Sequence, residues 1–161
     1  MVVWEQPVFN RTQADVDFAL QKISEWMLTN DSNVLKRIYD LKGCLNVSDI
    51  NRIENNIKIL SEILTKYGYS PNTSYRQWKK GDIPTEDDVK RIVKSVKSLV
   101  DSFVRHEEAP DVPSTMGTYE SINDIEKNLY LINILINTME QCFKCSNTFQ
   151  SGSTMFLPIW R

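Results

Sequence analysis

Two segments of the chain carry the same pattern at an interval of 72 residues. Residues 50–56 and 122–128 both read I-N-x-I-E-x-N, and T-x-x-D-V occurs ahead of each, at 12–16 and 85–89. Both halves therefore show a capping-box-like helix start followed by a second helix with apolar residues at helical spacing. This order predicts a helical fold.

One interpretation of the recurrence is a tandem duplication with pseudo-repeats at 1–73 and 74–161. Each unit would contain a helix, a second helix and an extended segment, and the two I-N-x-I-E-x-N helices would form the central pair. Because neither unit buries its apolar stripe alone, both would fold as one domain, 1–161. The alternative is that two helical hairpins merely obey the same capping and spacing rules.

Apolar residues recur at intervals of three and four in four long segments, which predicts four long helices arranged as two hairpins. A shorter helical piece is expected at 33–41, ended by Gly43. In the first long helix the expected apolar stripe is Val16, Ala19, Leu20, Ile23, Trp26 and Met27. The expected N-terminal capping residues are Thr12, Ser48, Thr85 and Ser121.

The remaining segments are expected to be extended or irregular. Residues 69–80 are rich in aromatic and turn residues, and 105–120 contains prolines and a glycine that predict a surface loop. A small β-hairpin is expected around Ser151-Gly152, and residues 2–4 are expected to add a short strand. The predicted fold class is mainly α, with little β structure from the termini and the 69–80 segment.

The charge balance argues against two classes of partner. The 161 residues include 19 Lys and Arg and 21 Asp and Glu, a net charge of -2, with the two signs interspersed. This composition offers no electrostatic basis for binding duplex nucleic acid or an anionic membrane. No apolar run predicts a membrane span, the N-terminal residues lack a signal-peptide pattern, and the 3 cysteines suit synthesis in a reducing cytosol.

No pattern predicts an enzyme, a cofactor or a metal site. Cys142 and Cys145 form a C-x-x-C, but structural zinc needs four ligands, and the other candidates, Cys44 and His106, are distant in sequence. A redox role needs a βαβ context, which is absent. His106 is expected to be solvated, at a helix end or in a loop.

The acidic residues are candidates for paired carboxylates, but their positions favour a structural interpretation. Glu54 and Glu126 flank their apolar stripes and are expected to meet Arg52 or Lys58 as exposed ion pairs. Negative charge in the first turn of a helix stabilises the helix dipole. We expect that position for Asp15, Asp49 and Asp124.

An aromatic and basic cluster lies at 67–80. Its members are Tyr67, Tyr69, Tyr75 and Trp78, with Arg76, Lys79 and Lys80. Three interpretations are open: the aromatic side chains anchor a loop onto the helices, form a protein interface, or bind sugar or single-stranded nucleic acid.

Several short motifs are spread over nearly the whole chain. They are N-R-T-Q-A-D-V at 10–16, L-K-G-C-L-N-V-S-D-I-N-R-I-E at 41–54, Trp78 with G-D-I-P-T at 81–85, N-D-I-E at 123–126, and Ser151-Gly152 with Leu157-Pro158. As a set they resemble a family of small proteins and domains encoded in the tail and baseplate regions of phages and prophages of Gram-positive bacteria. Asn10 stands where that family often has Asp, and Cys44 where it often has Ala.

The resemblance implies a virion structural protein of a phage tail or baseplate, made in the host bacterial cytoplasm and without catalysis. Its partners would be other tail or baseplate proteins, in a homo-oligomer or a ring-symmetric assembly. The extended termini, 2–9 and 149–160, suit binding to neighbouring subunits. The predicted interface residues are Trp4, Tyr75, Trp78, Phe156 and Trp160. The alternative is a receptor- or glycan-binding adaptor of the tail tip, whose 69–78 segment contacts cell-wall sugar.

Overall fold

The computed structural model describes residues 3–39 and 41–146, and within these residues it contains five helices and no strand. The predicted mainly helical fold class is therefore confirmed. The helices are α1 (Gln13–Thr29), α2 (Ser32–Ile38), α3 (Val47–Lys66), α4 (Glu86–Ser102) and α5 (Tyr119–Ser146).

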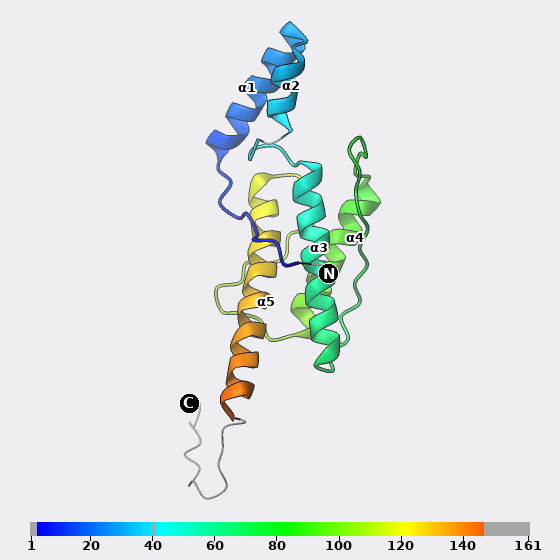
Figure 1. The fold of residues 1–161 in the computed structure, drawn as a ribbon, viewed down its shortest axis with the longest axis vertical. Helices are drawn as coiled ribbons and strands as arrows, with labels where there is room; N and C mark the ends of the chain where they lie inside the picture. Colours follow the sequence, from blue (N-terminus) through cyan, green and yellow to red (C-terminus); the bar gives the residue numbers. More distant parts are fainter. Residues whose placement is uncertain (1–2, 40, 147–161) are drawn as a thin grey trace, which may run out of the picture.

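Helices α3, α4 and α5 each pack against the other two and enclose the hydrophobic core (Figure 1). The predicted apolar stripes supply this core, because residues three and four apart lie on one face of a helix. Trp78 and Met116, from the segments between the helices, complete it. The fully buried side chains include Ile57, Leu60, Leu64, Val96, Leu99, Ile125 and Leu129.

Helices α1 and α2 pack on each other as a hairpin that projects from one end of the molecule (Figure 1). The prediction of four long helices as two equivalent hairpins is not confirmed, because α4 packs on α3 and α5, whereas α1 packs on α2. The corresponding segment after α4 contains Pro110 and Pro113, which disfavour a helix there.

The predicted helix starts are correct for α1 and α4 and wrong for α3 and α5. Thr12 and Thr85 are N-caps with complete capping boxes. Helix α3 begins at Val47 instead of Ser48, because the Asp49 carboxylate accepts the backbone N–H of Asn46 at 3.1 Å. Helix α5 begins at Tyr119, and Thr118 and Ser121 exchange backbone-to-hydroxyl hydrogen bonds of 3.1 and 3.2 Å. Asp124 therefore lies beyond the first turn of α5.

Two extended segments, 3–11 and 69–78, bind along the helices instead of forming the predicted strands. Their backbone groups bond to side chains on the helices, so neither has a strand partner. The expected β-hairpin around Ser151-Gly152 lies outside the described residues. The 105–120 loop was expected at the surface, but Met116 is buried in the core.

Candidate functional site

The asparagine of each I-N-x-I-E-x-N pattern binds an extended segment. Asn51 on α3 accepts the backbone N–H of Trp78 at 2.8 Å and donates to its carbonyl at 3.0 Å. Asn123 on α5 binds Arg11 in the same manner, at 3.1 and 2.9 Å. Each helix therefore holds the segment that leads into the first helix of the other predicted pseudo-repeat. The duplication itself stays a prediction.

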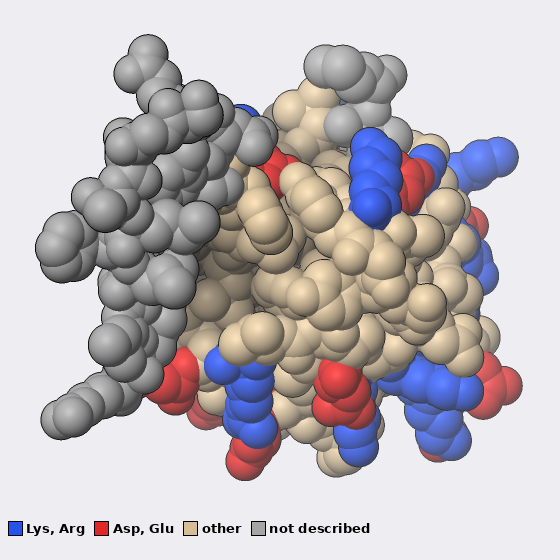
Figure 2. All heavy atoms as spheres, turned by 90° about the horizontal axis from the view of Figure 1, so that it is seen from below, with Lys and Arg blue, Asp and Glu red and all other residues tan. Residues whose placement is uncertain are grey.

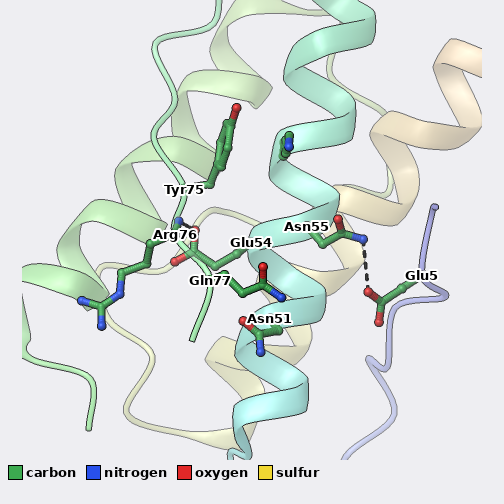
Figure 3. A pocket seen from close by; sticks show the side chains of 8 residues that line it. Glu5, Asn51, Glu54, Asn55, Tyr75, Arg76 and Gln77 are labelled. Carbon is green, nitrogen blue, oxygen red and sulfur yellow. Dashed lines mark hydrogen bonds between the residues drawn. The ribbon is translucent and has the colours of Figure 1, made fainter. Parts of the chain in front are cut away.

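The glutamate of the first pattern is buried between α3, α4 and the 69–78 segment. Glu54 is 2 % exposed and accepts the indole N–H of Trp78 at 3.1 Å and the backbone N–H of Arg76 at 3.3 Å. Arg91 on α4 pairs with it through both terminal nitrogens. Figure 3 shows Glu54 between the extended segment and α3.

The glutamate of the second pattern lies at the centre of a buried ion-pair cluster. Glu126, 1 % exposed, pairs with Arg52 at 2.7 Å and with Arg11 at 3.2 Å, and it accepts the backbone N–H of Val8. Asp49 pairs with both arginines and brings the cluster to zero net charge. Burial lowers the pKa of Arg52, but the hydrogen bonds and charges of Glu126 and then Asp49 outweigh it and raise that pKa overall.

The expectation of exposed pairs at Glu54 and Glu126 is therefore wrong, although Glu126 does meet Arg52. Each carboxylate binds donors from two other chain segments, so it stabilises the packing of those two segments on its own helix. Sequence reasoning missed this burial because it judged each carboxylate by its polarity. One feature of the sequence did point to it: in both patterns a glutamate follows, by three residues, the asparagine that binds an extended segment.

The cysteines and His106 are the residues considered above for metal or redox chemistry. No three His, Cys, Asp or Glu side chains among them are grouped so that they could hold a metal ion. Cys142 is exposed and Cys44 is half-buried, both as free thiols, and the side chain of Cys145 lies outside the described part. His106 lies in a loop and accepts the backbone N–H of Glu108 at 3.1 Å.

The predicted interface residues occupy different environments. Trp78 is a core side chain, 3 % exposed, so it anchors the 69–78 segment. Trp4 is half-buried against the core, and the 3–11 segment binds the molecule's own α3 and α5 rather than standing free. Tyr75 is 47 % exposed. Phe156 and Trp160 lie outside the described residues.

A polar cavity of about 390 Å³ lies beside Tyr75, between the N-terminal segment, α3 and the 69–78 segment (Figure 3). The Lys58 ammonium group lies 5.3 Å from the centre of the Tyr75 ring. The amide of Asn55 donates to the Glu5 carboxylate at 3.1 Å on the other wall. The cavity combines an aromatic ring with amide and charged groups, a combination suited to a polar ligand such as a sugar. Its lining also includes Asn51, Glu54, Arg76 and Gln77.

An exposed apolar surface on α1 was missed by the sequence reasoning, which placed the α1 stripe in a common core. Ala19 is the only buried residue of α1, whereas Leu20 and Met27 are 56 % and 71 % exposed. Because Ile23 stands between them at helical spacing, these three side chains form one edge of the helix, here called the hairpin surface. The seven-residue α2 is too short to cover the whole stripe.

On the face that Figure 2 shows, charged side chains of one sign do not form a continuous patch. In the view from below, Lys and Arg lie beside Asp and Glu around the rim of the molecule, with uncharged residues between them (Figure 2). This distribution favours contacts based on shape and apolar area over contacts based on charge.

Comparison with known proteins found no match among protein-family models, curated proteins or solved structures. Among the described residues, none of the helices is long and apolar enough to span a membrane.

Proposed function

We propose that the protein is a structural component of a phage tail or baseplate and acts by protein–protein assembly. The observation that carries this proposal is the hairpin surface on the projecting pair of helices, where Leu20 and Met27 are 56 % and 71 % exposed and Ile23 between them is half-buried. Apolar side chains grouped in this manner mark interaction sites in soluble proteins.

The positions of the family-like motifs support the same proposal. Arg11, Asp49, Asn51 and Glu54 belong to those motifs, and each of them holds helices and extended segments together. Their side chains are occupied by partners within the chain. Such motifs define a scaffold, as an assembly protein requires.

Labelling of phage particles tests the proposal. Antibodies against the protein, applied to purified particles from a host that carries the gene, are expected to mark the tail in electron micrographs. Particles from a host carrying Leu20→Gln and Met27→Gln should lose the label. A protein found only in the soluble fraction, with unlabelled wild-type particles, would contradict the proposal.

A second candidate function, a glycan-binding adaptor of the tail tip, is favoured by the cavity beside Tyr75. The exposed ring and the surrounding amides offer stacking and hydrogen bonds to a sugar. Binding to a cell-wall glycan array that is lost in Tyr75→Ala would support it, and absence of binding by the wild type would remove it. Trp78→Ala is unsuitable here, because it would empty the core.

A further inference from the structure

We infer that the hairpin surface of one copy binds the apolar 149–160 segment of a second copy, so that copies join head to tail. The inference rests on the proposed function in treating the hairpin surface as an assembly surface, and it adds the identity of the partner.

The apolar residues at the exposed edge of α1 form an extended surface. Leu20 and Met27 stand seven residues apart, which is two turns, with Ile23 between them, so their side chains form a continuous line on α1. Ala19, on the neighbouring edge of α1, is 2 % exposed, and Ile23 is half-buried. Leu28, next to the end of α1, is 88 % exposed and extends the apolar area toward the tip.

The chain beyond α5 has the composition of a partner for an apolar surface. Residues 147–160 contain no Lys, Arg, Asp or Glu, and they are rich in large apolar side chains. Such a segment gains free energy by covering an apolar surface, at roughly 25 cal/mol per Å² of apolar area removed from water. Its large apolar residues are Phe149, Met155, Phe156, Leu157, Ile159 and Trp160.

The length of the chain beyond α5 limits which hairpin surface it can reach. The hairpin projects beyond the N-terminal end of α5, whereas the chain leaves α5 at the opposite end of the molecule (Figure 1). Helix α5 has 28 residues and is therefore about 42 Å long. Residues 147–161 span at most about 50 Å when fully extended. To reach the hairpin of its own copy, the segment would have to run back along α5 almost fully extended. We therefore infer that it binds the hairpin surface of another copy.

A contact of this type joins two different surfaces, and it therefore continues from copy to copy. Heterologous contacts close into rings or extend into filaments, and a ring suits a component of a phage tail. Neither the three residues of the hairpin surface nor the 149–160 segment includes a charged side chain. Because salt screens charges, we expect this contact to persist at high ionic strength.

Two defective full-length variants test the inference when mixed. The hairpin variant, Leu20→Gln with Met27→Gln, keeps an intact 149–160 segment, and the segment variant, Phe156→Ser with Trp160→Ser, keeps an intact hairpin surface. Each is expected to have the mass of one copy by light scattering, and an equimolar mixture is expected to yield a complex of two copies. Glutamine maintains helix propensity in α1, and circular dichroism verifies that both variants are folded.

A matched control and a direct binding measurement complete the test. Phe18 is 49 % exposed and lies on roughly the opposite side of α1 from Leu20 and Met27, so Phe18→Gln should assemble as the wild type does. A fluorescent peptide of residues 147–161 should bind the segment variant and should not bind the hairpin variant. A mixture that stays at one-copy mass, together with no change in peptide anisotropy, would overturn the inference. If the wild type still labels the tail in that case, the proposed function stands and only the binding between copies is excluded.

Discussion

Asn123 binds both backbone polar groups of Arg11, accepting its N–H at 3.1 Å and donating to its carbonyl at 2.9 Å. The amide thus replaces the partner that a neighbouring strand would supply to an extended chain. Asn123→Ala should lower the free energy of unfolding by about 3 kcal/mol, because it leaves the backbone groups of a buried residue unsatisfied. Urea denaturation measures this change. Asn55→Ala is the control, since its bonds to the N-terminal segment are exposed and its loss should cost much less.

Glu126→Gln should be among the most destabilising single changes in the chain. The substitution preserves shape but leaves Arg11 and Arg52 with one carboxylate between them, which corresponds to a loss of about 3–5 kcal/mol for a broken buried pair. Thermal and urea unfolding would report it. Asp111→Asn removes an exposed carboxylate that pairs with Arg105, and its effect should stay within about 0.5 kcal/mol. Equal effects of the two changes would contradict the assigned role of the buried cluster.

Gly43→Ala should destabilise the connection between the hairpin and the three-helix core. A Cβ atom at this position would lie 2.0 Å from the backbone oxygen of Asp15, so the chain must shift. The expected loss is about 1–3 kcal/mol, as for other overpacked sites. Hydrogen exchange should locate it in α1 and in residues 41–46. Gly117→Ala is the control, because its nearest neighbour would be a flexible threonine side chain at 3.7 Å.

The capping box of α4 predicts a defined pH dependence. Hydrogen bonds from the hydroxyl and the backbone N–H of Thr85, followed by the charges of Arg76 and Arg91, hold the pKa of Asp88 below its ordinary value of 3.8. The ionised group therefore stabilises the folded state above pH 3.8, and this contribution is lost as the pH falls through the lower pKa of the folded state. Wild type should exceed Asp88→Asn in stability near neutral pH, and the difference should shrink below pH 3.8. A constant difference across that range would contradict the assignment.

The local parts of this fold could be predicted from the sequence. Helical stripes and capping boxes depend on residues within one or two turns, and Thr12 with Asp15 and Thr85 with Asp88 occupy their predicted positions. The packing of α1 on α2 could not be predicted in this way, because the spacing of apolar residues identifies the apolar face of a helix but not the element that packs against it. Helix α1 packs on α2, a short helix without a counterpart among the described residues of the second half.

The buried polar contacts were also beyond local reasoning. Asn51 and Trp78 are 27 residues apart, and Arg11 and Glu126 are 115 apart. Contacts over such separations depend on the completed fold. Recurrence of the asparagine and glutamate in both halves was visible, but only the structure shows that they bind extended segments. Trp78 illustrates the same point: the sequence left loop anchoring, a protein interface and ligand binding open for its cluster, and Glu54 and the core enclose its side chain.

The solution mass of the full chain tests the central claim of the further inference, that copies of the protein assemble with one another through the hairpin surface. Size exclusion with light scattering would compare the wild type with Leu20→Gln/Met27→Gln and with Phe18→Gln. We predict a defined multiple of the one-copy mass for the wild type and for Phe18→Gln, and the one-copy mass for the double variant. A wild type at one-copy mass, or a double variant with the wild-type mass, would contradict the claim.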